Sequence, residues 1–366
     1  MPLTTRSAVV SAKDAPFEIR DLELRDPRPH EVIVEVAAVG VCHTDIIMQE
    51  QFFPVPLPAV FGHEGAGIVR QIGGDVTKVA VGDHVVLGFA SCGNCRNCLR
   101  GLPSYCLHYY EWNFKGSLLD GTTALTDDGA DVAAHFFGQS SFSRYSLCSE
   151  RNVVKVDPTV DLTILGPLGC GVQTGAGAVL NSLGVEAGST IAVFGAGGVG
   201  LSAVMAAVVA GATTIVAVDV APSRLDLALK LGATHVIDAS KAEVAAELQR
   251  IVPEGFMYTV ETTGRPDVLV TAVDTLMVTG VCGTIGASPM GTTAAINMNN
   301  LIFGRTIRGI CEGDSVPEIF IPQLIELYKQ GRFPFDKMIS HYAFDDINTA
   351  CEDAKALRAI KPVLVF

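Results

Sequence analysis

A glycine-rich stretch between two apolar segments constrains the fold of this chain more than any other feature. Residues 190–194 read Thr-Ile-Ala-Val-Phe, a β-branched and aromatic run of the kind found in a buried parallel strand. Gly195, Gly197 and Gly200 then follow with the spacing G-x-G-x-x-G, and residues 201–210 contain no helix breaker before Gly211. This order predicts a strand, a tight turn and a helix whose N-terminal amides accept a pyrophosphate.

An acidic residue at the end of the next predicted strand completes the pattern. Asp219 lies about twenty residues after the glycines, where a carboxylate accepts hydrogen bonds from a ribose diol and repels a 2′-phosphate. A membrane span is the alternative, because no charged residue occurs between Glu186 and Asp219. A lipid-facing helix does not begin with five glycines and end in a β-branched strand, so a dinucleotide-binding unit is favoured.

Length and composition limit the remaining possibilities. The 366 residues are enough for about two domains, and 49% hydrophobic with 18% charged residues is typical of a folded globular chain. The net charge of −13 and the lack of basic runs argue against nucleic acid or an anionic membrane as a partner. No signal peptide precedes the first predicted strand, so we expect a cytoplasmic protein. In that setting the ten cysteines indicate metal ligation or catalysis rather than disulfides.

Four of these cysteines are close together in the sequence. Cys92, Cys95 and Cys98 follow the pattern C-x2-C-x2-C, and Cys106 comes after seven further residues. This spacing predicts a closed tetrahedral zinc site without an open position for substrate. An iron–sulfur cluster is the alternative metal site, but its fourth cysteine would follow after three residues and precede a proline, whereas Leu107 follows Cys106. A lobe without metal is the remaining alternative.

The predicted secondary structure changes along the chain. The N-terminal part is β-rich, with strands predicted at 6–11, 17–24, 31–41, 62–69, 138–150 and 153–157. Beyond Asp219, strands at 235–238, 257–261 and 280–285 alternate with helices at 223–231, 241–252 and 266–277, which predicts an α/β fold with a doubly wound parallel sheet. The C-terminal part shows one clear helix at 322–330 and a strand at 363–366, and we expect it to pack on the first domain.

Several motifs together resemble a known family. The run Gly62-His63-Glu64-x2-Gly67-x5-Gly73-x2-Val76 is similar to the signature of the zinc-containing alcohol dehydrogenases in the medium-chain dehydrogenase/reductase family. The resemblance covers the whole chain and within the family is closest to bacterial aryl-alcohol (benzyl alcohol) dehydrogenases. It implies a mostly β, GroES-like catalytic domain with a zinc lobe at 1–171, a Rossmann domain that binds NAD at 172–311, and a return to the catalytic domain at 312–366.

The resemblance also implies a second, catalytic zinc ion. Its ligands would be Cys42, His63 and Cys170, and two thiolates, one imidazole and an open fourth position are what a catalytic zinc site requires. Glu64 would lie behind the metal, where it tunes or transiently joins the ligand set. Asp45 would orient the imidazole of His63.

Proton transfer is expected to involve the segment after Cys42. The resemblance assigns to Thr44 the hydroxyl that takes the proton of the substrate; a helix N-cap is the alternative role for this side chain. Some family members have a histidine three residues further on that passes the proton to solvent. This chain has Ile47 there, which cannot carry a proton, so the relay would end at water or His43.

The expected cofactor contacts come from the same resemblance. Thr174 and Val199 would lie near the nicotinamide, Arg224 at the adenosine ribose, and His43 and Lys361 at the pyrophosphate. Arg224 has two alternative roles, as a solvated helix charge or as a partner of a 2′-phosphate, and because Asp219 opposes the latter we expect NAD. The full set of predicted cofactor-binding residues is His43, Thr174, Gly195, Gly197, Val199, Gly200, Asp219, Arg224, Arg265 and Lys361.

The sequence thus predicts an NAD-dependent primary alcohol dehydrogenase with two zinc ions per subunit and a homo-oligomeric state, dimer or tetramer. Zinc lowers the pKa of bound water from about 15.7 to about 7, and a similar fall for an alcohol corresponds to about 12 kcal/mol. Aromatic alcohols are the expected substrates, since Phe52, Phe53, Phe89 and Trp112 can line an apolar pocket or belong to the ordinary core. The alternatives are a glutathione-dependent formaldehyde dehydrogenase and a non-enzymatic nucleotide-sensing protein on the same fold.

Overall fold

The computed structural model describes residues 3–366, which fold into two compact units. The first unit consists of the chain up to Cys170 together with Val316–Leu324 and Asp336–Phe366. The second unit consists of Gly171–Ser315 and Ile325–Phe335. The first unit has two sheets and the second has one, and each unit has its own buried core.

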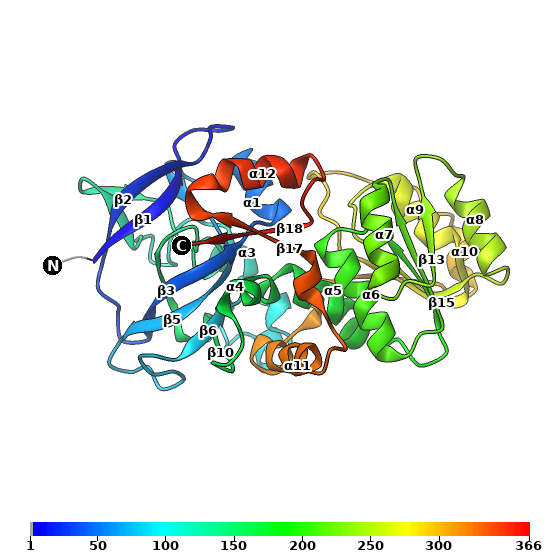
Figure 1. Cartoon of the computed structure of the whole chain (residues 1–366), viewed down its shortest axis with the longest axis horizontal. Coiled ribbons are helices and arrows are strands. Elements are labelled where there is room, and N and C mark those ends of the chain that lie inside the picture. Colours follow the sequence, from blue (N-terminus) through cyan, green and yellow to red (C-terminus); the bar gives the residue numbers. More distant parts are fainter. Residues whose placement is uncertain (1–2) are drawn as a thin grey trace. The chain divides into compact units, whose positions relative to one another are not determined.

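The first unit is built on two sheets of mainly antiparallel strands (Figure 1). One sheet has the order β4 (Ala59–Val60), β1 (Leu3–Val10), β2 (Glu18–Leu24), β7 (Leu125–Asp127) and β8 (Ala130–Val132). The other has the order β10 (Val153–Lys155), β6 (His84–Leu87), β5 (Glu64–Ile72), β3 (Glu31–Gly40), β18 (Lys361–Val365) and β17 (Ile339–Ala343), and β9 (Tyr145–Ser149) also pairs with β3. Strand β3 is rich in β-branched residues because both of its faces are buried.

The second unit is a doubly wound sheet of six parallel strands, as predicted. Their order is β13 (His235–Asp238), β12 (Thr214–Asp219), β11 (Thr190–Phe194), β14 (Phe256–Glu261), β15 (Leu276–Thr284) and β16 (Thr306–Gly309). Helices α6 (Gly198–Ala210) and α7 (Pro222–Lys230) cover one face, and α8 (Val244–Ile251) and α9 (Pro266–Asp274) cover the other (Figure 1). The chain reverses direction across the sheet at β11, where ligands bind in folds of this type.

Most predicted elements agree with the structure to within three residues at each end, and three differ by more. Of the predicted strand at 138–150, only β9 is a strand, because the residues before it form a 3₁₀ turn, η2 (Phe136–Gly138), followed by a loop. Strand β15 begins at Leu276, four residues earlier than predicted. The C-terminal helix α11 (Pro317–Lys329) begins before Pro322, because the burial of Phe320 and Ile321 stabilises a turn that the proline alone would disfavour.

The C-terminal segment also contains a helix that the sequence pattern did not reveal. Helix α12 (Ile347–Lys355) buries Ile347, Ala350 and Cys351, and it lies between β17 and β18 in the chain. These two strands join the β3 sheet, so the chain end completes the first unit.

The apolar stretch considered as a membrane span folds as β11, α6 and β12. Over residues 3–366 no single helix is long and apolar enough to cross a membrane, although the bent pair Leu162–Gly169 and Gly171–Ser182 passes by length and composition.

Candidate catalytic metal centre and dinucleotide site

Three segments of the first unit bring a buried group of donor atoms together. Cys42 precedes helix α1 (His43–Gln49) at the end of β3, His63 precedes β5, and Cys170 follows the 3₁₀ turn η4 (Gly166–Gly169). Cys42, His63, Glu64 and Cys170 each offer a donor atom, and these atoms all lie within 4.8 Å of one another. The structure therefore brings together the residues expected to bind the catalytic zinc.

The imidazole of His63 is oriented by a buried carboxylate. Its Nδ1 lies 2.8 Å from Oδ1 of Asp45, and both side chains are 0% exposed. Burial alone would lower the pKa of His63, but the negative charge and hydrogen bond of Asp45, with the nearby Cys42, raise it well above its usual value. The other ring nitrogen, Nε2, is buried without a hydrogen-bond partner among the described residues.

The same carboxylate organises the backbone around the site. Asp45 accepts hydrogen bonds from the backbone amides of Cys42, at 2.9 Å, and Gly62, at 3.1 Å. Cys42 is the N-cap of α1, so the alternative N-cap role considered for Thr44 is wrong. The hydroxyl of Thr44 instead lies 3.7 Å from the sulfur of Cys42, beside the donor atoms. His43 is exposed and Ile47 is buried on the same helix.

Glu64 and Lys361 form a buried ion pair next to the donor atoms. The ammonium group of Lys361 lies 2.8 Å and 2.9 Å from the two carboxylate oxygens of Glu64, and it donates to the carbonyl of Val41 at 3.4 Å. Burial raises the pKa of Glu64 against the influence of Lys361, and the carboxylate raises the pKa of Lys361 despite burial. The predicted contact of Lys361 with the cofactor pyrophosphate stays a prediction, because the observed partner of its ammonium group is Glu64.

The buried donor group has the chemistry of a catalytic zinc site. A hydrogen bond from Cys170 and, against the effect of burial, the positive charge of Lys361 lower the pKa of the Cys42 thiol, which favours the thiolate. A buried imidazole nitrogen without a partner beside two thiols is costly unless a cation is present. Zinc prefers sulfur and nitrogen donors, and three protein ligands leave a fourth position for an alcohol. These residues fit the metal.

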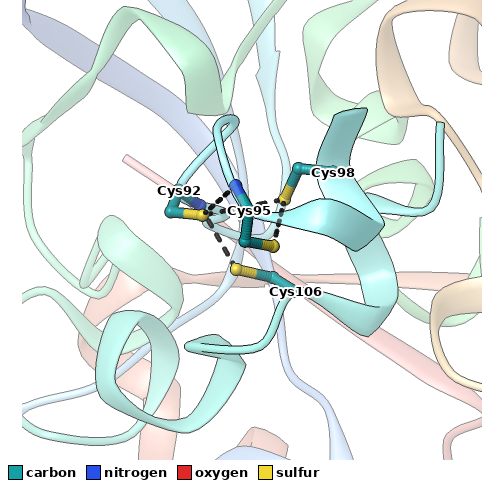
Figure 2. A group of neighbouring side chains, drawn as sticks. All are labelled: Cys92, Cys95, Cys98 and Cys106. Atoms are coloured by element: carbon teal, nitrogen blue, oxygen red, sulfur yellow. Dashed lines mark hydrogen bonds between the residues drawn. The ribbon is translucent and has the colours of Figure 1, made fainter. Parts of the chain in front are cut away.

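The other predicted metal site is a lobe of the same unit, shown in Figure 2. The sulfur atoms of its four cysteines all lie within 4.8 Å of one another. We call this group, Cys92, Cys95, Cys98 and Cys106, the four-cysteine cage. Among the described residues the donor atoms of this cage are four thiols, whereas the donor group of the other centre also includes the imidazole of His63 and the carboxylate of Glu64.

Backbone amides surround the sulfur atoms of the four-cysteine cage. Amide groups donate to Cys106 from Cys92 and His108 at 3.4 Å, to Cys92 from Cys95 at 3.3 Å, and to Cys95 from Leu107 at 3.5 Å. Backbone hydrogen bonds from Cys98 and Leu107 lower the pKa of Cys95 to about 6, while burial raises the pKa of Cys106 to about 12. Thiolates this close repel one another, and a cation between them removes the repulsion, so the cage fits a structural zinc ion.

The glycine turn of the second unit has the shape expected for a dinucleotide site. Helix α6 begins after Gly197, its N-cap. A Cβ on Gly200 would lie 1.7 Å from the carbonyl oxygen of Gly195, so the turn itself requires glycine there. A Cβ on Gly197 would meet only the Arg224 guanidinium at 3.7 Å, so the absence of a side chain leaves room for a ligand at the helix N-terminus.

Asp219 connects this turn to the next strand. Its carboxylate accepts hydrogen bonds from the backbone amides of Ala196, at 2.6 Å, and Ala221, at 2.8 Å. It also borders a cavity of about 330 Å³ that lies within the second unit. The cavity is lined by Phe194, Gly195, Val218, Asp219, Thr263, Arg265, Asp267 and Val268, among others. A mainly apolar cavity bordered by a carboxylate suits the adenosine half of a dinucleotide.

The remaining predicted cofactor residues have these positions. Arg224 lies beside Gly197, and its Nε is buried without a hydrogen-bond partner among the described residues. Arg265 borders the cavity and pairs with Asp267 at 2.8 Å. Val199 is in the first turn of α6. Thr174, in helix α5 (Gly171–Gly177), donates to Glu312 at 3.4 Å.

Sequence reasoning missed the aromatic residues that contact the metal centre. The ring of Phe137 stacks on the imidazole of His63 with centroids 4.4 Å apart, and Phe136 approaches it edge-on at 5.4 Å. Phe114 connects Phe137, at 5.2 Å, to Phe53, at 5.4 Å. Phe53 was a predicted pocket residue, whereas no spacing pattern singled out the other three rings.

Comparison with known proteins agrees with this site. Residues 28–158 match the family described as alcohol dehydrogenase GroES-like domain, and residues 198–330 match the zinc-binding dehydrogenase family. The sequence is 41% identical to a geraniol dehydrogenase from Castellaniella defragrans, over 100% of this chain and 98% of that protein.

The solved structures that cover the whole chain include two with at least 46% sequence identity. An alcohol dehydrogenase zinc-binding domain protein from Burkholderia ambifaria has a TM-score of 0.99 and 50% identity, covering 100% of both chains. A benzyl alcohol dehydrogenase from Acinetobacter calcoaceticus has a TM-score of 0.97 and 46% identity, covering 100% of this chain and 99% of that chain. Because the likeness extends over every segment that supplies a donor atom, the chain belongs to the zinc-dependent alcohol dehydrogenases of the medium-chain dehydrogenase/reductase family.

Proposed function

We propose that this enzyme oxidises primary alcohols whose carbinol carbon is attached to an sp² carbon, aromatic (benzyl-type) alcohols above all, to aldehydes with NAD. The observation that carries the chemistry is the group of Cys42, His63 and Cys170, in which a buried imidazole nitrogen has no hydrogen-bond partner among the described residues. The substrate class is supported by the relatives, because benzyl alcohol and geraniol both carry an unsaturated carbon next to the carbinol carbon.

The residues of the first unit prepare the alcohol for oxidation. When bound, zinc supplies a Lewis acid that lowers the pKa of the alcohol. Asp45 holds the His63 ring through Nδ1, which leaves Nε2 for the metal. We propose that the hydroxyl of Thr44, which lies 3.7 Å from the Cys42 sulfur, accepts the proton of the alcohol. Ile47 is buried and apolar, so we propose that the proton leaves through His43, which is exposed, or through water.

The residues of the second unit hold the cofactor. The amides at the start of α6 receive the pyrophosphate, and Asp219 receives the adenosine ribose. When bound, NAD supplies the hydride acceptor. The proposed preference for NAD rests on the Asp219 carboxylate, which would repel a 2′-phosphate.

Matched pairs of alcohols test the substrate class. We expect kcat/KM to be higher for benzyl alcohol than for cyclohexylmethanol, and higher for geraniol than for citronellol, which lacks the double bond next to the carbinol group. A preference within the first pair alone would restrict the class to aromatic alcohols. A higher kcat/KM for ethanol than for benzyl alcohol would contradict the proposal, and activity only with the glutathione adduct of formaldehyde would replace it.

Substitution of the ribose carboxylate tests the cofactor. We expect Asp219→Gly to raise KM for NAD and to relax the bias against NADP. Asp219→Asn separates the charge of this side chain from its hydrogen bonding. Its amide oxygen can still accept a hydrogen bond from the backbone amide of Ala196, but the negative charge is lost. If neither variant changes the ratio of kcat/KM values for the two cofactors, Asp219 does not select NAD.

The edge of the second-unit sheet supports the expected homo-oligomer. Strand β16 is the last strand in its order, and exposed apolar side chains precede it at Met298, Ile302 and Phe303. We propose that a second copy of this chain pairs along this edge, which would also cover the exposed apolar side chains that precede β16. Light scattering on the parent enzyme and on Ile302→Asp tests this proposal, and we expect the variant to have the lower molar mass. An equal molar mass for the two proteins would contradict the proposal.

A further inference from the structure

The His63 ring is held by a hydrogen bond to Asp45 and by contacts with two aromatic rings, Phe137 against its face and Phe136 edge-on. Asp45 fixes Nδ1 at 2.8 Å, which sets one point of the ring but allows the ring to tilt about that bond. Phe137 lies against the flat face of the imidazole, with centroids 4.4 Å apart and an angle of 25° between the ring planes. This contact limits the tilt, and the tilt decides where Nε2 points.

Phe137 occupies its place through an unusual backbone conformation. Its φ of 50° and ψ of 31° are in the left-handed region, which bulky residues rarely adopt. His135, with φ 66°, and Ser140, with φ 49°, are also left-handed. We call residues 135–140 the backing loop. Strain of this kind persists only where the surroundings enforce it.

Hydrogen bonds attach the backing loop to the segment that carries His63. The side-chain amide nitrogen of Gln139 donates to the backbone carbonyl of His63 at 2.9 Å. The side-chain oxygen of Gln139 accepts from the backbone amide of Gly65 at 3.2 Å. The hydroxyl of Ser140 donates to the carbonyl of Val60 at 2.6 Å. From the opposite side, Asn152 donates to the carbonyl of Phe137 at 3.1 Å. All these side chains are buried, so the loop and the metal-ligand segment form one hydrogen-bonded body.

We propose that Phe137 is a positioning residue, whose ring holds the plane of the His63 imidazole so that Nε2 faces the two thiols. The backing loop accepts left-handed backbone geometry to place that ring. This inference rests on the proposed role of His63 as a ligand of the catalytic zinc. It assigns to Phe137 a function distinct from lining a substrate pocket, because the predicted consequence of its loss is a looser metal.

The test compares Phe137→Leu, Phe137→Met and Phe137→Tyr with Phe17→Leu. Met keeps most of the buried volume but has no flat ring, whereas Tyr keeps the ring. Phe17 is the matched control: it is 3% exposed, belongs to the same core cluster as Phe137, and packs on Phe142. The readouts are the rate of zinc release to a chelator, the visible spectrum of the cobalt-substituted enzyme, and kcat and KM.

We expect Phe137→Leu and Phe137→Met to release one of the two zinc ions about tenfold faster, with an altered cobalt spectrum and a kcat about tenfold lower. KM should change much less, and Phe137→Tyr and Phe17→Leu should behave like the parent enzyme. Parent-like zinc release and cobalt spectra in Phe137→Met would overturn the proposal, as would an equal change in Phe17→Leu.

A further variant separates this proposal from the function on which it rests. Cys170→Ser should retain one zinc ion, in the four-cysteine cage. If it retains two, the catalytic zinc site itself is wrong. If it retains one while Phe137→Met remains parent-like, only the positioning role of Phe137 is wrong.

Discussion

The two metal sites of the first unit are built in opposite ways. The four-cysteine cage takes all its donors from residues 92–106, and the groups that surround its sulfur atoms are backbone amides. The catalytic centre takes its donors from three distant segments, and side chains orient them: Asp45 and Phe137 act on His63, and Lys361 pairs with Glu64. One site is thus a property of a short loop, and the other is a property of the whole unit.

This difference has a chemical reason. A structural zinc ion needs four equivalent donors and no open position for a substrate, and a compact loop can supply such donors. A catalytic zinc ion needs an open position and ligands held in a fixed geometry, which only rigid elements and buried partners provide. Substitutions should therefore separate the two sites, with activity responding to one and stability to the other.

The largest effect should come from a catalytic ligand. Cys170→Ser should lower kcat/KM by at least about a thousandfold, because the alcohol then keeps its proton at neutral pH. The thermal midpoint should change little, since the serine occupies the same buried space. Kinetics, metal analysis and calorimetry on one preparation check this, and a thermal midpoint that falls together with activity would show that the two sites are not separable.

The next largest effect should come from a ligand of the cage. Cys98→Ser should lower the thermal midpoint by roughly 10 °C, because the lobe loses the cation that offsets thiolate repulsion. Below that temperature kcat should remain within about threefold of the parent value, since none of the cage sulfurs belongs to the catalytic group. Calorimetry measures the thermal midpoint, and assays at a low temperature measure kcat. If Cys98→Ser is folded but inactive at the low temperature, the two metal sites do not act separately on stability and activity.

A smaller effect is expected for the partner of a ligand. Asp45→Asn should weaken zinc retention at the catalytic centre or lower kcat by about ten- to a hundredfold, because the amide is a poorer partner for His63 Nδ1. Asn97→Ala is the matched control in the loop that carries the four-cysteine cage. There the side-chain amide of Asn97 donates to the backbone carbonyl of Tyr105 at 2.7 Å. Its kcat should stay unchanged. Equal loss of activity in the two variants would remove the distinction between the sites.

The same contrast explains what the sequence could predict. The cage and the glycine turn are local, so the spacing of Cys92–Cys106 and of Gly195–Gly200 predicted them directly. The catalytic donors have no such spacing, and only the family resemblance brought Cys42, His63 and Cys170 together.

Two features of the catalytic centre could be predicted neither from residue spacing nor from the family resemblance. The pairing of Lys361 with Glu64 joins residues 297 positions apart, and nothing in either segment indicates the other. The stacking of Phe137 on His63 depends on left-handed backbone geometry in the backing loop, and Phe137 lies just before the strand predicted at 138–150, so no predicted element included it. Periodicity predicts regular elements, and this loop departs from them because the fold enforces another conformation.

The smallest predicted effect is a pH dependence that belongs to the backing loop. Burial lowers the pKa of His135 to about 4, and the nearby positive charge of Arg25 adds to this. In the unfolded chain its pKa is about 6.5, so between pH 6.5 and 4 the unfolded state binds a proton that the folded state does not. Stability should therefore fall as pH decreases through this window, by about 1 kcal/mol at pH 5.5 from this residue.

His135→Gln isolates this contribution, because glutamine does not titrate and has a similar size. The difference between parent and variant in free energy of unfolding should change by about 1 kcal/mol between pH 7.5 and pH 5.5, with the parent losing more. Denaturant titrations at the two pH values measure it. His108→Gln is the control, because His108 contacts the four-cysteine cage through its backbone amide. A parent enzyme that loses no more stability than His135→Gln would mean that the His135 ring is protonated in the folded protein, and the backing loop would then be less tightly closed than its hydrogen bonds indicate.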